Sequence, residues 1–95
     1  MSDKTLYLVQ SSFQQTDSVL NQLEHLYTAH DHIVLMGDAV LFVQDPRILN
    51  KQHVAVLEND AEILGKSMNY SHMKVIDYAA FADLCLGFKR CISLK

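Results

Sequence analysis

Cysteine is scarce in this chain, which contains only Cys85 and Cys91. A secreted domain stapled by disulfides needs a larger, regularly spaced set of cysteines, so that class is excluded. Residues 1–9 lack a basic segment followed by a long apolar stretch, and no apolar run is long enough to span a bilayer. We therefore expect a cytoplasmic protein with reduced thiols, no signal peptide and no membrane association.

Positive charge is also sparse. The net charge is −3, and the densest basic spot is the dipeptide Lys89-Arg90. A protein that binds a nucleic-acid backbone needs several clustered cations, so direct binding of DNA or RNA is not expected. The glycine motifs of dinucleotide-binding folds and P-loops are absent as well. We accordingly expect no cofactor.

Glycine and proline are too few to form a flexible linker, with three and one in the whole chain. Hydrophobic residues make up 49% of the sequence and charged residues 20%, which is typical of a folded globular protein. No internal repeat or low-complexity segment interrupts this composition. The sequence therefore predicts a single domain over residues 1–95.

Short apolar runs predict the strands of this domain. Residues 6–9, 33–36 and 54–57 are apolar at every position, which is typical of strands covered on both faces of a parallel sheet. Residues 73–76 form a fourth run, and the alternating residues 92–94 predict an edge strand. The sequence thus contains four or five strand candidates.

Helical periodicity appears between these runs. One apolar helical face spans residues 17–27, and another spans residues 78–88, with Asp77 placed to cap the second helix. Residues 59–62 resemble a capping box, with Gly65 closing a short helix. Pro46 indicates a turn at residues 45–47, and residues 38–43 fit either a helix or a strand.

Strands that alternate with helices predict right-handed βαβ units. The expected fold is a small three-layer α/β domain with a mainly parallel sheet of about four or five strands. The apolar run Leu41-Phe42-Val43 has no place in the two main helices or the strands, and Met68 and Tyr70 lie in a loop-like segment. We expect residues 41–43 either to form a subunit interface or to be an ordinary buried segment.

Polar residues follow the predicted strands, where open α/β sheets bind their ligands. These positions hold Gln10-Ser11-Ser12, Gly37-Asp38, Glu58-Asn59-Asp60 and Asp77-Tyr78. Their acidic character opposes phosphate binding. Asp38, Asp60 and Asp77 have the right chemistry for acid/base catalysis, but helix capping and turn formation explain each of them locally.

Two further patterns are candidates for chemistry. Ser11 and Ser12 lack a neighbouring histidine and the elbow motif of hydrolases, so a turn and helix entry explains them better. His30-x-His32 has a spacing found in zinc sites, but no third ligand is evident in the sequence. We expect no catalytic residue, no cofactor-binding residue and no metal ligand in this chain.

The two cysteines have different surroundings. Cys85 shares an apolar helical face with Phe81 and Phe88, which predicts a covered thiol with a raised pKa. Cys91 follows Lys89 and Arg90, whose charges favour a thiolate. Cys91 is therefore the better candidate for a reactive sulfur.

The segment Ile76-Asp77-Tyr78-x-x-Phe81 resembles the start of the last helix in the TusB/DsrH family. Gly37-Asp38-Ala39-Val40 is similar to the small, acidic turn after the family's second strand, and Leu57-x-x-Asp60 to the start of its next short helix. The resemblance extends from about Leu6 to Arg90. It rests largely on the order and spacing of the elements.

This resemblance implies a DsrEFH-like fold and a place in a sulfur-relay complex. Such subunits assemble with TusC/DsrF-like and TusD/DsrE-like paralogues into a dimer of heterotrimers. In the Tus branch, persulfide sulfur passes from a TusA-like carrier to a TusE-like carrier and ends in 2-thiolation of wobble uridine in tRNA. In the Dsr branch, the complex serves dissimilatory sulfur oxidation.

One departure from the family bears on the choice between these branches. Some DsrH-type members have a cysteine in the first helix, whereas residues 17–27 contain none and Gln22 takes about that position. This favours a non-catalytic, TusB-like subunit with no activity of its own. Two alternatives stay open: a DsrH-like subunit that carries persulfide on Cys91, and an unrelated small-ligand or regulatory α/β module.

Overall fold

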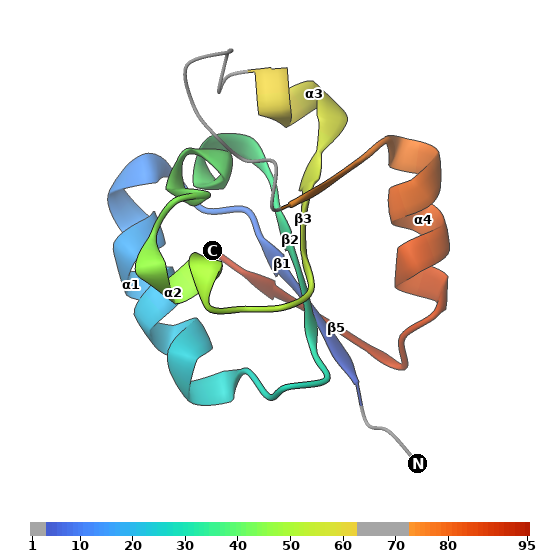
Figure 1. Ribbon diagram of the computed structural model, residues 1–95, viewed down its shortest axis with the longest axis horizontal. Helices are drawn as coiled ribbons and strands as arrows, with labels where there is room; N and C mark the ends of the chain where they lie inside the picture. Colours follow the sequence, from blue (N-terminus) through green and yellow to red (C-terminus); the bar gives the residue numbers. More distant parts are fainter. Residues whose placement is uncertain (1–3, 63–72) are drawn as a thin grey trace.

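The apolar segments of the sequence come together in a parallel β-sheet (Figure 1). The computed structural model describes residues 4–62 and 73–95. Within them the sheet has five strands: β1 (Thr5–Val9), β2 (His32–Leu35), β3 (Val54–Leu57), β4 (Lys74–Ile76) and β5 (Arg90–Leu94). Their order is β4-β3-β2-β1-β5, and each neighbouring pair is parallel. The expected parallel sheet and the edge position of the last strand are confirmed.

Among the described residues, three helices cover one face of the sheet, which we call the α1 face (Figure 1). They are α1 (Phe13–Leu26), the 3-10 helix η1 (Gly37–Phe42) and α2 (Pro46–Leu49). The short helix α3 (Glu58–Ala61) lies at the carboxyl end of β3. The core of this face joins the sheet to the helices and includes Tyr7, Val9, Leu20, Leu23, Ile33, Leu35, Val40, Ile48 and Val56.

The opposite face, the α4 face, is covered by α4 (Tyr78–Leu86) (Figure 1). In residues 4–62 and 73–95 its core is smaller, with the buried residues Leu6, Val34, Met36, Ala55, Leu57 and Ile76 and partly buried hydrophobic side chains packed against them. Phe81 is one of these, so its expected burial against the sheet is confirmed only in part. No residue of α4 is fully buried. The predicted helices on both faces are therefore present, but they cover the sheet unequally.

Two helix boundaries differ from the sequence prediction for local reasons. α1 begins at Phe13 rather than near Asp17, with Ser12 as its N-cap. The turn expected at residues 45–47 is instead the start of α2, because Asp45 caps it and Pro46 occupies its first position. The fixed φ of proline suits a helix, and at the first helical position its missing N–H would have no partner within the helix.

Two other segments also resolve differently from the expectations. The ambiguous residues 38–43 lie largely within η1. The predicted capping box at residues 59–62 is wrong, because α3 begins earlier, with Leu57 at its N-cap and no side-chain cap bond. Gly65, expected to close that helix, lies outside the described residues.

The run at residues 41–43 belongs to the core rather than to an open surface. Val43 is completely buried, and Leu41 and Phe42 are partly buried against the core of the α1 face. Of the two alternatives, the buried segment is confirmed for Val43, whereas an interface that includes the partly buried Leu41 and Phe42 stays a prediction. Met68 and Tyr70, named with it, lie outside the described residues. Among the helices that the structure describes, none combines the length and the apolar character needed to cross a membrane.

Candidate functional site

A hollow of about 420 Å³ opens at the carboxyl ends of β1, β2 and β3, beside the start of α4. We call it the carboxyl-end hollow. Its position agrees with the usual ligand site of open α/β sheets. It is lined by Leu8, Gln10, Met36, Gly37, Leu57, Asp60, Tyr78 and Phe81.

A hydrogen bond between η1 and α3 shapes this hollow. Gly37 has a φ of 59°, a left-handed conformation in which a residue with a side chain would be strained. Its N–H donates to the Asp60 carboxylate at 2.9 Å, linking the end of β2 to α3. Gly37 and Asp60 therefore fix the loops that line the hollow.

The three predicted carboxylates do not form an acid/base pair. Asp77 accepts a hydrogen bond from the N–H of Ala80 at 2.8 Å and caps α4, as expected. The Asp60 carboxylate accepts a hydrogen bond from the N–H of Gly37, and Asp38 is exposed in the first turn of η1. The interpretation of these residues as local caps is confirmed for Asp77, whereas Asp60 instead makes a long-range hydrogen bond to Gly37.

The two serines are structural parts of the entry to α1. The buried Ser11 hydroxyl lies 2.8 Å from that of Thr16, which in turn donates to the carbonyl oxygen of Ser12 at 2.7 Å. No histidine is among the residues that line the carboxyl-end hollow beside them. A turn and helix entry therefore explains both serines.

Both cysteines lie at the opposite end of the sheet from this hollow. Cys85 is in the last turn of α4, where burial and the neighbouring Cys91 thiol raise its pKa. Cys91 is the second residue of β5, opposite Leu6 of β1, and is exposed. The raised pKa predicted for Cys85 is confirmed, although its side chain is only partly buried.

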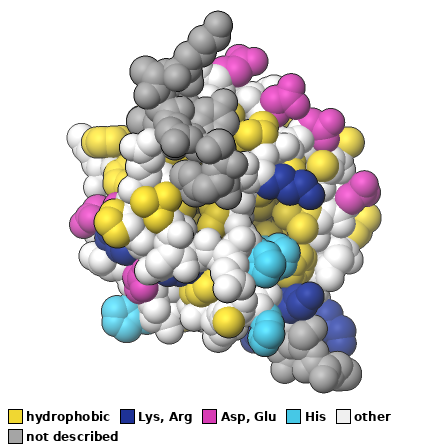
Figure 2. Space-filling view, viewed as in Figure 1, with side chains coloured by type: hydrophobic (Ala, Val, Ile, Leu, Met, Phe, Trp, Pro, Cys, Tyr) yellow, Lys and Arg dark blue, Asp and Glu magenta, His cyan; other side chains and the backbone are white. Residues whose placement is uncertain are grey.

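A larger cavity of about 540 Å³ lies on the α4 face, toward the amino ends of β2 and β3. We call it the histidine cavity. Figure 2 shows this side of the molecule, with histidine and basic side chains around a hollow that has hydrophobic side chains within it. It is lined by His32, Ile33, Gln52, His53, Val54, Ala55, Lys74, Ile76, Ala80, Asp83 and Leu84.

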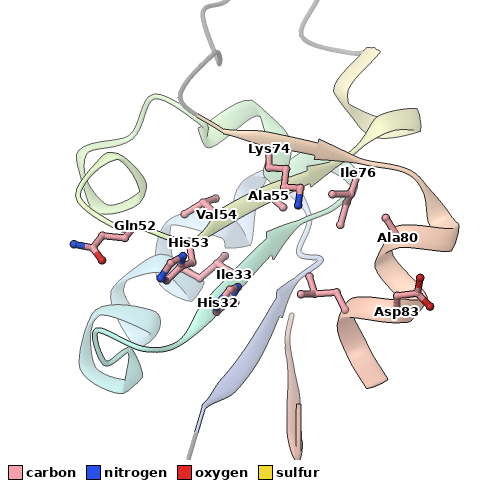
Figure 3. A pocket seen from close by; sticks show the side chains of 11 residues that line it. His32, Ile33, Gln52, His53, Val54, Ala55, Lys74, Ile76, Ala80 and Asp83 are labelled. Atoms are coloured by element: carbon pink, nitrogen blue, oxygen red, sulfur yellow. The ribbon is translucent and has the colours of Figure 1, made fainter. Parts of the chain in front are cut away.

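Two imidazole rings stack at one end of the histidine cavity (Figure 3). The rings of His32 and His53 are 4.3 Å apart and nearly parallel, and Phe88 meets the His32 ring edge-on at 5.0 Å. The backbone fixes this pair, because the N–H of Ile33 donates to the carbonyl oxygen of His53 at 2.9 Å. Asp31, the residue before His32, is buried and accepts a hydrogen bond from the N–H of Thr5.

The surroundings of His32 favour its neutral form. Burial lowers the pKa of His32, and the neighbouring His53 and Lys4 lower it further. Lys74 extends from β4 into the space facing α4, and Asp83 stands on the α4 wall (Figure 3). The cavity therefore combines two imidazole rings and the Lys74 side chain with an apolar floor.

The two histidines of the candidate His30-x-His32 pair do not come together. His30 lies in an exposed turn, whereas the His32 ring stacks on His53. In the part of the chain that the structure describes, no three histidine, cysteine or acidic side chains are placed to hold a metal ion. The His32–His53 contact was not predicted. Its only sequence signal is that each histidine precedes an apolar residue of neighbouring strands.

Comparisons with known proteins place this chain in a family. No curated protein matches it. Among solved structures, a conserved protein of unknown function from Bacteroides thetaiotaomicron is 18% identical and superposes with a TM-score of 0.63, covering 97% of this chain and 95% of that one. The family model described as DsrH like protein matches residues 10–91, most of the chain. The protein therefore belongs to the DsrH-like family, and this membership implies a role related to sulfur relay.

Proposed function

We propose that this chain is a non-catalytic, TusB-like subunit of a cytoplasmic sulfur-relay complex. Its partners are TusC/DsrF-like and TusD/DsrE-like paralogues in a dimer of heterotrimers. The complex takes persulfide sulfur from a TusA-like carrier, delivers it to a TusE-like carrier and supports 2-thiolation of the tRNA wobble uridine. The chain itself makes no direct contact with the tRNA.

The observation that carries this proposal is the apolar surface that α4 leaves exposed. Tyr78, Phe81, Leu84 and Leu86 give the helix an apolar composition, yet none of its residues is fully buried. Tyr78 is 59% exposed and Leu86 is 85% exposed. An apolar helix facing solvent marks a protein contact, because burying that surface in an assembly stabilises it. The helix therefore fits a subunit that works with partners.

The position of the cysteines supports a structural rather than a sulfur-carrying role. The carboxyl-end hollow occupies the usual ligand site of the fold, and no cysteine lines it. Cys85 and Cys91 lie at the other end of the sheet. A sulfur that travels through the carboxyl-end hollow would therefore not meet a thiol of this subunit.

The test is a relay reconstituted with and without the cysteines of this chain. The carriers, both paralogous subunits and a substrate tRNA are combined with the unchanged chain or with Cys85→Ser/Cys91→Ser, and 2-thiouridine is measured by mass spectrometry. Equal thiolation with both chains, and strongly reduced thiolation without the chain, is the expected result. Loss of thiolation in the cysteine-free variant would instead favour the persulfide-carrying alternative on Cys91.

The histidine cavity favours a second candidate, a small-ligand α/β module. The cavity combines an apolar floor with His32, His53 and Lys74, the mixture that small-molecule sites use. This candidate requires the isolated chain to be a stable monomer whose melting temperature rises with a ligand. Screening small carboxylates and amino acids by thermal shift, with Lys74→Met as the comparison, separates it from the relay subunit.

A further inference from the structure

The two cysteines of the chain meet where α4 ends and β5 begins. In the sheet register Cys91 lies opposite Leu6, a core residue of the α4 face, so both side chains are on that face. Cys85 packs against the same core from α4. The Cys91 thiol donates to the carbonyl oxygen of Cys85 at a sulfur–oxygen distance of 3.7 Å, which places the Cys91 sulfur against the end of α4 that carries Cys85.

The two thiols differ in access. Cys91 is exposed, so a sulfur donor can reach it. Cys85 is partly covered by its packing against the core, and burial keeps its pKa above the ordinary value. Such an arrangement, with an accessible thiol and a covered neighbour, is that of an attacking and a resolving cysteine.

The geometry points to a dithiol function: Cys91 accepts sulfane sulfur from a low-molecular-weight or protein persulfide, and Cys85 then releases that sulfur as hydrosulfide. In the first step the Cys91 thiolate attacks the outer sulfur of the donor. The sulfur–sulfur bond of the donor breaks, its thiol leaves, and a persulfide forms on Cys91.

In the second step Cys85 loses its proton to solvent and its thiolate attacks the Sγ atom of Cys91. The bond from Cys91 Sγ to the outer sulfur breaks, and the outer sulfur leaves with the electron pair as hydrosulfide. The two cysteine sulfurs are oxidised to an intrachain disulfide while the sulfane sulfur is reduced. A low-molecular-weight thiol such as glutathione regenerates the dithiol by exchange.

This inference rests on the proposed function only in that a sulfur relay supplies the persulfide donors. Within such a relay, the chain would return misplaced sulfur as hydrosulfide instead of storing it on Cys91. A relay subunit with an exposed thiol off the transfer route would gain from this reaction, because a persulfide left there is lost to the acceptor.

The experiment uses the reduced, isolated chain without oxygen and glutathione persulfide as the donor. Hydrosulfide is measured by bimane derivatisation, and the protein by intact mass. The unchanged chain should release hydrosulfide and become two hydrogens lighter. Cys85→Ser should instead become one sulfur heavier on Cys91, with hydrosulfide reduced to the level of the donor alone. Cys91→Ser should show neither product.

Cys85→Ala is a second variant that guards against a folding defect of Cys85→Ser, and circular dichroism checks both. Hydrosulfide release should also accelerate as the pH rises, since Cys85 must lose its proton to attack. A stable persulfide on the unchanged chain, equal hydrosulfide release from Cys85→Ser, or no reaction at all would overturn the inference. None of these results decides the assembly or thiolation tests, which measure complex formation and 2-thiouridine rather than hydrosulfide.

Discussion

The pKa of His32 depends on the residues around its ring. Its ring stacks on His53 and meets Phe88, and the nearby charge of Lys4 adds to the cost of protonation. Burial is the largest cause, His53 and Lys4 act in the same direction and the Asp31 carboxylate opposes them, so that the pKa of His32 lies below the ordinary value of 6.5. The folded protein therefore binds a proton at this site less readily than the unfolded chain does.

This difference predicts a pH-dependent stability. As the pH falls through about 6.5, His32 of the unfolded chain takes up a proton before the folded chain does, so the free energy of unfolding decreases. Above that range both states are neutral and the penalty disappears. Urea unfolding at about pH 5.5 and about pH 7.5 measures the effect. In His32→Gln the decrease should be smaller.

The exposed His30 provides the control for this experiment. His30→Gln also removes a histidine but leaves the stacked pair intact. If His30→Gln and His32→Gln reduced the pH dependence equally, the stacked pair would not be its cause.

The same scale shows what the sequence can reveal about single residues. The cap at Asp77 was predictable because its partner, the N–H of Ala80, is three residues away. The covered thiol of Cys85 followed from helical periodicity. The stacking of His32 on His53 depends on how β2 aligns with β3, and no local pattern carries that register.

At the scale of elements, α4 is held to the sheet by partly buried side chains. Phe81 is the largest of those in the middle of the helix, and it contributes both to the core of the α4 face and to the wall of the carboxyl-end hollow. Leu84, Cys85 and Phe88 add to the same contact. The helix is therefore docked, but less deeply than α1, which has four fully buried residues.

Phe81→Ala should weaken this docking. A fully buried phenylalanine costs roughly 3–5 kcal/mol on truncation, and the partial burial of Phe81 reduces the expected loss to about 2–3 kcal/mol. The measurement is the midpoint of urea unfolding. Ala82→Gly, at an exposed position of the same helix, serves as a control for helix propensity alone and should cost about 1 kcal/mol. Equal losses in both variants would mean that Phe81 makes no useful contact.

The elements themselves differ in how well the sequence predicts them. The apolar runs located the strands, because strands buried on both faces leave a continuous signal. The short elements η1, α2 and α3 were ambiguous or missed, since they depend on a few backbone hydrogen bonds rather than on a repeated pattern. The order of parallel strands was not predictable either, because the crossovers allow several arrangements.

At the scale of the whole molecule, the two faces of the sheet are unequally covered. Five strands at about 4.8 Å spacing span roughly 19 Å, whereas one helix with its side chains is about 10–12 Å wide. In the described residues α4 covers its face alone, and the histidine cavity opens where that cover ends. An assembly that places further structure beside α4 would complete this layer.

This imbalance predicts an assembly that depends on the outer surface of α4. Leu86→Glu should disrupt the complex with the paralogous subunits, because the new carboxylate would be buried without a partner in the interface. A loss of about 2 kcal/mol or more, roughly thirtyfold in affinity, is expected. Leu86 is so exposed that the melting temperature of the isolated chain should hardly change.

Leu49→Glu is the matched control, since Leu49 is an exposed leucine on α2, which covers the other face. Both variants are co-expressed with the paralogues, and complex mass is measured by size exclusion with light scattering. Leu49→Glu should assemble normally, whereas Leu86→Glu should leave the subunit apart.

The unchanged chain made alone should self-associate through the same surface, and Leu86→Glu should reduce this. Normal assembly of Leu86→Glu would show that α4 is not the contact surface. If the unchanged chain stays monomeric and binds neither paralogue, the relay-subunit proposal itself is wrong.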